Sequence, residues 1–432
     1  MKMKKLFVLM MTAVIGFALT ACSEDEPEMS TGTVVVSLTG VSGDLSNIEV
    51  ILRGTSTFSA KADANGKALF TVSAGVYEAT ASGTFANSGS IYTANGTAGQ
   101  ITVLANQTTN VTIEMKEART SQVIIKEVYN GGCPKNDGSG TFQYDKCIIL
   151  YNNTGQTATL DNLAFAFAAP YNGHAMNDNY GEDGKLVYES QGFNPAYNGI
   201  WWFPNTLIIE PYTQVVVNVN GAIDNTLTVS QSVNYANADY YCMYDPESGY
   251  NNSNYYPTPS SKIDYSHYLK ATKIGLGNAW ALSSTSPALF IFQTQGTTPA
   301  AFAENSGNLW YDGGKKSDVN ACLKVPNEWI LDGVEIFQTT KITDSNKRLT
   351  ADIDAGFVGL TASLGHTLYR NVNKEATEAL HENAGKLVYN YNADPSGIDA
   401  EASIKQGAHI IYKDTNNSSE DFHEREKCSL RN

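Results

Sequence analysis

The chain alternates apolar and polar residues in short runs over most of its length. Between residues 31 and 116 these runs read TGTVVVSLTG, NIEVILRG, KALFTVSAGVYEATASG and GQITVLANQTTNVTIEM, and Gly, Asn and Asp separate them. A period of two residues with turn residues between the runs predicts antiparallel strands. Only the short stretch NKEATEALHENAG has the 3.6-residue period of a helix. The pattern therefore predicts an all-β protein.

The strand runs fall into two groups. The first occupies residues 31–116, and the polar stretch KEARTSQ separates it from a second group at residues 121–432. We expect two tandem antiparallel β-sandwiches, the second enlarged by long loop insertions. Within the first group, Asp63-Ala64-Asn65-Gly66 stands between two alternating runs. An Asn-Gly pair in that position predicts a β-hairpin.

The first thirty residues form a different pattern. Lys2, Lys4 and Lys5 precede an apolar run that ends at Leu19, which is typical of a secretory signal and too short for a stable membrane span. The sequence Leu19-Thr20-Ala21-Cys22 resembles a bacterial lipobox. This resemblance implies that residues 1–21 are removed and that Cys22 carries lipid, which would anchor the chain permanently in a membrane.

An acidic segment, SEDEPE, follows immediately in residues 22–30. It resembles the surface-export signal of Bacteroidetes lipoproteins, which implies an outer-membrane location facing the cell exterior. A solvated linker between the anchor and the folded part is the alternative interpretation, and both interpretations stay open here.

Two further resemblances concern the strand-rich regions. In residues 31–116, VILRG, the Asn65-Gly66 turn with KALFTV, and AGVYEATAS are similar to carboxypeptidase-regulatory or transthyretin-like sandwiches. Modules of that family mostly act as stalks or spacers. Residues 121–432 resemble a lamin-tail-like, immunoglobulin-like domain through VIIKEVYNGG, CIILYNNTGQTATLDNLAF, FPNTLIIEPYTQVVVNVN, ILDGVEIF and GHTLYR. Ile149 and Tyr212 depart from that family, which usually has Glu and Gly there.

The whole chain resembles an uncharacterised family of Bacteroidales surface lipoproteins. Such lipoproteins often work beside a TonB-dependent outer-membrane receptor that takes up glycans, metal chelates or other nutrients. The resemblance thus implies a membrane contact through the lipid, a receptor partner and a small-molecule or glycan ligand.

The charge of the chain bears on its binding partners, and its cysteine content bears on disulfide bonds. The chain has 29 Lys and Arg against 44 Asp and Glu, a net charge of −15, with no basic patch. Because nucleic-acid binding needs clustered basic residues, we expect none. Cys133 and Cys147 flank a loop rich in Gly and Asp. They could be bridged, which would stabilise an exported protein by about 3 kcal/mol, or they could be free buried thiols.

No motif in the sequence supports catalysis. There is no nucleophile elbow, no paired histidine at helical spacing and no phosphate-binding glycine loop. Asp352 and Asp354 could share one face of a strand as paired carboxylates, although a solvated strand edge or turn is the simpler interpretation. We therefore expect a non-enzymatic protein without a cofactor or a metal site.

Aromatic residues are the candidates for recognition. NPAYNGIWWFPN carries Tyr197, Trp201 and Trp202, and the Tyr- and Asn-rich stretch 235–270 adds Tyr244, Tyr250, Tyr255 and Tyr256. Tyr, Trp and Asn are typical of binding surfaces. The alternative is that these rings pack onto the sandwich. In a strand, adjacent Trp201 and Trp202 would face opposite sides, so only one could lie in the core.

Three functional hypotheses follow. The first is a lipid-anchored, non-catalytic binding module, and the second is a structural or adhesive surface protein. The third is a hydrolase with an unrecognised site. A concave site with several exposed rings would favour binding, whereas a flat or collapsed arrangement of the tyrosines would favour the structural hypothesis.

Overall fold

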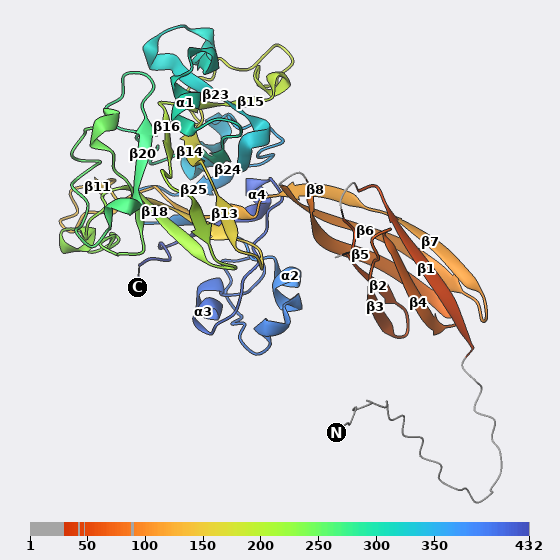
Figure 1. Ribbon diagram of the computed structural model, residues 1–432. Coiled ribbons are helices and arrows are strands. Elements are labelled where there is room, and N and C mark those ends of the chain that lie inside the picture. The colour runs from red at the N-terminus through yellow and green to blue at the C-terminus, as the bar shows by residue number, and fades with distance from the viewer. Residues whose placement is uncertain (1–29, 42–43, 47, 88–89, 432) are drawn as a thin grey trace, which may run out of the picture. The chain divides into compact units, whose positions relative to one another are not determined.

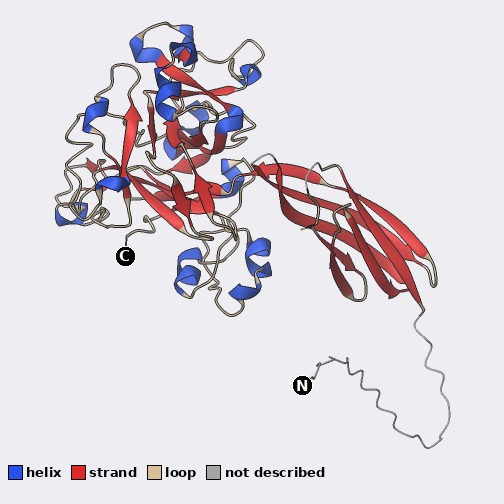
Figure 2. Cartoon of the chain, in the orientation of Figure 1, coloured by secondary structure: helices blue, strands red, loops and turns tan. Residues whose placement is uncertain are grey.

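The computed structural model describes residues 30–41, 44–46, 48–87 and 90–431. The proposed leader, Cys22 and most of the acidic segment lie outside the described residues. Strands predominate and the helices are short, as Figure 2 shows, which confirms the all-β prediction. The chain divides into two compact units, Met1–Gly83 with Ala94–Lys116, and Thr84–Thr93 with Glu117–Asn432. Each unit is described by itself.

The first unit is built from two sheets. One has the strand order β4-β1-β7, with β1 (Thr31–Thr39) antiparallel to β4 (Lys67–Ser73) and parallel to β7 (Thr108–Glu114). The other has the order β3-β2-β5-β6, formed by β2 (Glu49–Arg53), β3 (Thr57–Lys61) and the parts of β5 (Gly75–Asn87) and β6 (Ser90–Val103) that belong to this unit. Strand β8 (Lys116–Thr120) follows β6 in the strand order and, except for Lys116, is counted in the second unit. Alternate residues of β1, β2 and β4 are buried, so the period-two pattern marks the core side of each strand.

The predicted Asn-Gly hairpin is wrong in its connectivity. Residues 63–66 do form a tight turn, in which the amides of Asn65 and Lys67 donate to Asp63 Oδ1 at 2.9 and 2.8 Å. The strands before and after it, β3 and β4, belong to different sheets. The turn therefore carries the chain from one sheet to the other, because turn chemistry fixes the local bend but not the partner of the next strand.

The second unit contains a sheet of twelve strands in the order β25-β24-β21-β14-β16-β20-β19-β18-β12-β9-β26-β27. Their bounds are β9 (Val123–Tyr129), β12 (Lys146–Asn152), β14 (Leu163–Phe167), β16 (Ile200–Trp202), β18 (Gln214–Asn220), β19 (Tyr241–Met243), β20 (Tyr268–Thr272), β21 (Ala288–Gln293), β24 (Ile330–Gln338), β25 (Val358–Leu360), β26 (Thr367–Arg370) and β27 (Phe422–Arg425). Most neighbours are antiparallel, and β18-β19, β19-β20 and β24-β25 are parallel.

This sheet curls until its two ends meet, so it is nearly closed. Near one end β24 contacts β9, where Ile125 N donates to Asp332 Oδ2 at 2.6 Å. Strand β25 contacts β27, where Thr361 N donates to Glu424 Oε1 at 2.5 Å. The inside holds the main core, which includes Ile148, Leu150, Phe165, Trp201 and Ile291. Ile148 lies opposite Val128, and a register shift follows Ile149.

The outer face of the sheet is also covered, so every residue of β9, β12 and β14 is buried. One cover packs a second hydrophobic cluster and consists of β15 (Phe193–Tyr197), β22 (Leu309–Tyr311), β23 (Ala321–Pro326) and α1 (Pro299–Glu304). Another contains α2 (Lys374–Ala379) and α3 (Ala400–Lys405), which lie near each other in Figure 1. The remaining strands are β10 (Cys133–Pro134), β11 (Thr141–Phe142), β13 (Ala158–Leu160) and β17 (Leu207–Ile209), the remaining α-helix is α4 (Ser418–Asp421), and short 3-10 helices lie in the connecting segments. Among the described residues, no helix has the length and apolar character needed to cross a membrane.

Candidate functional site

Three of the aromatic residues proposed for a binding surface lie in the core instead. Trp201 is fully buried inside the nearly closed sheet, and Tyr250 stacks on it with ring centres 5.6 Å apart and an interplanar angle of 21°. Tyr256 packs against the same indole, and its hydroxyl accepts a hydrogen bond from Trp280 N at 3.0 Å. The Tyr-rich stretch therefore folds inward here, because the sheet interior can bury the rings while backbone groups satisfy the hydroxyls of Tyr250 and Tyr256.

The other four residues are half-buried, but they do not form one surface. Trp202 packs on the outer cover of the sheet, opposite to Trp201, as the alternation of a strand requires. Tyr244 meets Tyr268 edge-to-face at 5.6 Å, and Tyr255 meets Tyr144 in the same way at 5.1 Å. Tyr197 borders a cleft.

This cleft has a volume of about 220 Å³. A hollow of this size is below the roughly 300–1,000 Å³ of drug-sized sites and suits a single ring. Four chain segments meet there, and the lining consists of Phe167, Tyr171, Tyr197, Asn198, Ile274, Leu276, Gly277, Ala281, Asp318, Val319 and Ala321. We call it the Tyr197 cleft. The sequence singled out Tyr197 and missed the rest, because the segments converge only in the folded chain.

Apolar side chains are exposed around the Tyr197 cleft. Leu276 is 65% exposed, Val319 is 53% exposed and Tyr171 is 38% exposed. Phe167 lies behind them in the core and contacts the rings of Tyr171 and Tyr197 at 6.3 and 5.9 Å. Grouped exposed apolar side chains beside a hollow are typical of contact sites, whereas single ones need no explanation.

Two glycines hold Leu276 at the edge of the cleft. Gly275 has a φ of +78°, and a Cβ there would lie 2.5 Å from the carbonyl oxygen of Asp318. A Cβ on Gly277 would lie 2.6 Å from Asn198 Oδ1. The Gly-Leu-Gly stretch can therefore run close to both neighbouring segments, which any larger residue would prevent.

The polar groups of the cleft are few and mostly neutral. Tyr197 donates its hydroxyl to the carbonyl oxygen of Val319 at 3.0 Å, and Asn198 Nδ2 donates to Ala279 O at 2.9 Å. Burial, together with the nearby hydroxyls of Tyr255 and Tyr197, raises the pKa of Tyr171 to about 12, so its hydroxyl keeps its proton. Asp318 is exposed and adds a carboxylate. The site can thus offer apolar contact and a few hydrogen bonds.

A second hollow of about 160 Å³ lies beside an aromatic pair. Tyr241 and His267 stack with ring centres 4.2 Å apart and an interplanar angle of 18°. Phe203 supports Tyr241 edge-to-face at 5.1 Å, and His267 Nδ1 lies 3.2 Å from the carbonyl oxygen of Tyr240. This pair lies at a different place on the sheet from the Tyr197 cleft, with which it shares no lining residue.

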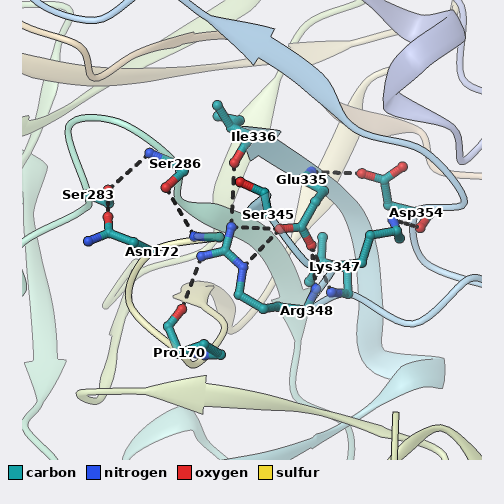
Figure 3. Close-up of polar contacts among 12 residues, drawn as sticks. Pro170, Asn172, Ser283, Ser286, Glu335, Ile336, Ser345, Lys347, Arg348 and Asp354 are labelled. Atoms are coloured by element: carbon teal, nitrogen blue, oxygen red, sulfur yellow. Dashed lines mark hydrogen bonds and ion pairs between the residues drawn. The ribbon is translucent and has the colours of Figure 1, made fainter. Parts of the chain in front are cut away.

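The buried ion pair of Glu335 and Arg348, which resembles a pair of catalytic groups, is already fully engaged (Figure 3). Arg348 donates to Glu335 Oε1 from Nη2 at 2.6 Å and from Nε at 2.9 Å, and it also reaches Pro170 O at 3.0 Å. The amides of Arg348 and Leu349 occupy Glu335 Oε2. A carboxylate and a guanidinium paired in this way, both without exposure, act as a structural link.

The paired-carboxylate interpretation of Asp352 and Asp354 is wrong. Asp354 is fully buried and accepts from Ser418 Oγ at 2.6 Å, whereas Asp352 is exposed and accepts from Asn327 Nδ2 at 2.9 Å. Within the described part of the chain, no group of three potential metal ligands comes together. The hydrogen bonds of Asp352 and Asp354 therefore stabilise the local backbone and side chains.

Cys133 and Cys147 are not bridged in the structure, which contradicts the disulfide alternative and agrees with the alternative of free buried thiols. Both are free and buried. The Cys133 thiol points to Asp145 Oδ2 at 3.8 Å, while Cys147 packs in a different cluster with Ile149 and Val216. Their closeness in sequence does not make them partners in the sheet. Cys133 pairs with Phe142 of β11, whereas Cys147 pairs with Tyr129 of β9.

A family model described as "Protein of unknown function (DUF4876)" matches residues 210–429. The crystal structure of a DUF4876 family protein from Bacteroides thetaiotaomicron is similar to the chain, with 19% identity and a TM-score of 0.57. The similarity covers 90% of this chain and 94% of that one, and at this identity it shows a shared fold. No curated protein sequence matches significantly.

Proposed function

The chain belongs to the DUF4876 family, whose function is unknown, and on this premise we propose that it is a non-catalytic binding module at the bacterial cell surface. A lipid on Cys22 would hold it at the outer membrane, facing the exterior. The first unit would then serve as a transthyretin-like spacer, and the second, lamin-tail-like unit would carry the binding site.

The observation that carries this proposal is the Tyr197 cleft. Its edge exposes Leu276 and Val319, and its volume of about 220 Å³ suits one ring. Exposed apolar groups beside a hollow cost free energy in water, so their retention favours a contact partner. The ring faces of Tyr171 and Tyr197 suit the C–H face of a sugar, and Asp318 can accept hydrogen bonds from hydroxyl groups. A glycan is thus the ligand we propose.

The proposed partner is a TonB-dependent outer-membrane receptor, which would take up the glycan after capture. Support for this step comes from the lipobox and from the family resemblance of the sequence. The test is a mild-detergent pull-down of the tagged, full-length chain from its native outer membrane. Recovery of one receptor in near-equal amount would support the proposal, and screening should then follow that receptor's substrates.

The matched control for this experiment is Cys22→Ala, which removes the proposed lipid and leaves the folded units unchanged. The Cys22→Ala variant should be absent from the membrane fraction, and its pull-down should recover no receptor. If the wild-type chain recovered no receptor and bound no glycan, the proposal would fail.

A specific observation also favours the structural alternative. Tyr250 and Tyr256 are collapsed into the core, which is the arrangement expected if the Tyr-rich stretch serves packing. For a structural or adhesive protein, the same pull-down should recover many surface proteins weakly, or none, and glycans should not bind.

A further inference from the structure

Two cysteines that are far apart in sequence share one buried cluster. Cys147 lies on β12 and Cys428 lies four residues from the end of the chain, and neither has any exposed surface. Their cluster, which we call the tail cluster, consists of Tyr129, Cys147, Ile149, Val216, Val233, Tyr235 and Cys428. Besides burial, which has the largest effect, the nearby Cys147 thiol raises the pKa of Cys428, so the two side chains are neighbours in this cluster.

The backbone around Cys428 is fixed against the sheet. Next to it, Ser429 N donates to Glu127 Oε1 at 2.9 Å, and Arg431 N donates to Cys428 O at 3.0 Å in a turn. Glu127 belongs to β9, the neighbour of β12, and Tyr129 of β9 lies directly opposite Cys147. The tail therefore holds the Cys428 sulfur beside the strand that carries Cys147.

The other three cysteines have different surroundings. Cys133 Sγ contacts Asp145 Oδ2 at 3.8 Å, and Cys322 Sγ contacts Asn320 O at 3.6 Å. Cys242 belongs to a separate cluster with Ala222 and Ile263. Of the five cysteines described, Cys147 and Cys428 are thus the two that share one hydrophobic cluster.

We propose that Cys147 and Cys428 form a disulfide when the chain folds under oxidising conditions, and that this bond fastens the C-terminal tail to β12. The oxidant is a disulfide-bearing protein or small molecule. One thiolate attacks it to give a mixed disulfide and release a thiolate, and the second cysteine then displaces the other half. The two cysteines lose two protons and two electrons, and the oxidant is reduced to two thiols.

Burial sets the time at which this exchange can happen. In the folded chain neither sulfur is accessible, and burial raises the pKa of the Cys428 thiol well above its usual range, so it stays protonated and unreactive. The bond must form before the tail packs and is then protected from reductants. The bond would close nearly the whole second unit into one covalent loop. A disulfide that closes a longer loop removes more entropy from the unfolded chain and so stabilises the folded state more.

The experiment counts thiols in the full chain. Protein refolded with glutathione disulfide, and protein purified from the outer membrane, are each denatured in iodoacetamide without reductant and digested. Cys22, the sixth cysteine of the full chain and the proposed lipid site, is left out of every count. Among the other five we expect three alkylated cysteines, Cys133, Cys242 and Cys322, and one linked peptide that joins Cys147 to Cys428. Reduction should give five alkylated cysteines and lower the melting temperature by roughly 5–10 °C.

Variants separate this bond from a general effect of reduction. Cys428→Ser should lose the linked peptide and the shift on reduction, while Cys322→Ala, another fully buried thiol, should retain both. Five free thiols in the refolded protein, or a link to another cysteine, would overturn the proposal. A link in refolded protein but not in the native protein would support the bond and count against export instead.

Discussion

Arg370 of β26 forms an ion pair with Asp332 of β24, and the two strands are each second from an end of the twelve-stranded sheet. The same guanidinium donates from Nε to the carbonyl oxygen of Ile125 at 2.8 Å, and Asp414 lies 3.3 Å away. One arginine therefore joins three strands where the sheet closes on itself. Sheet closure here depends on a buried polar contact as well as on the core.

Replacing this arginine should be strongly destabilising. In Arg370→Met, Asp332 and Asp414 would remain buried without their cation, and we expect a loss of about 3–5 kcal/mol in the free energy of unfolding. Urea denaturation followed by fluorescence measures this loss. The control is Lys374→Met, which removes an exposed pair with Glu378 and should cost less than about 0.5 kcal/mol. Equal effects of the two variants would contradict the role of Arg370.

Asp145 should make stability depend on pH. Its Oδ1 is buried without a hydrogen-bond partner, and burial raises its pKa to about 7 despite the hydrogen bonds from Ser232 and Tyr129. In the unfolded chain this carboxyl loses its proton near pH 4, whereas in the folded chain it keeps the proton until about pH 7. Its contribution to stability is therefore complete below about pH 4 and is lost as the pH rises to 7.

The variant Asp145→Asn should reduce the fall in stability between pH 4 and pH 7 by a few kcal/mol, because its amide does not titrate. Chemical denaturation at several pH values gives the slope directly. Asp137→Asn, at an exposed turn where Asp137 accepts from Ser139 N, is the control and should keep the wild-type slope. An unchanged slope in Asp145→Asn would mean that the buried carboxyl stays ionised.

The tyrosines of residues 235–270 should separate into two kinds. Tyr250→Ala removes a ring that stacks on Trp201 in the core, so we expect it to cost about 3–5 kcal/mol of stability. Tyr265→Ala, in the same stretch, removes a ring that is 74% exposed and should change stability by less than about 0.5 kcal/mol. Melting curves of both variants test this, and a mild effect of Tyr250→Ala would restore the binding-surface interpretation for that residue.

The sequence predicted the strand content well because burial on a strand alternates with a period of two, as in Val34, Val36 and Leu38 of β1. It also predicted correctly that Trp201 and Trp202 face opposite sides. Sequence could not show that both sides are covered, because the covering segments come from distant parts of the chain. The shared cluster of Cys147 and Cys428 could not be predicted for the same reason, since the sequence spacing favoured a pair of Cys147 with Cys133.

The Tyr197 cleft illustrates a second limit. The sequence shows that Leu276 stands between two glycines, but a flexible loop would have the same pattern. The role of these glycines in the cleft follows from Gly275, which has no Cβ and so lets the carbonyl of Asp318 approach closely. That contact depends on the tertiary structure, which the sequence pattern does not show.

Gly275→Ala is therefore the substitution that tests how the cleft is built. An alanine at a φ of +78° costs about 1–2 kcal/mol from the backbone alone, and the clash with Asp318 O adds about 1–3 kcal/mol. Gly184→Ala is the matched control, because Gly184 has a φ of +74° with open space around it. The Gly184→Ala variant should lose only the roughly 1–2 kcal/mol of stability that comes from the backbone conformation.

Hydrogen exchange locates the difference between these two variants. In Gly275→Ala, the backbone at Asp318 must move away from the new methyl group, so residues 318–321 should lose protection, and the position of Val319 at the cleft should change with them. Gly184→Ala should leave that segment unaffected. If both variants lost the same stability and kept the same protection, the close approach would not be what shapes the cleft, and Leu276 would be an ordinary exposed loop residue.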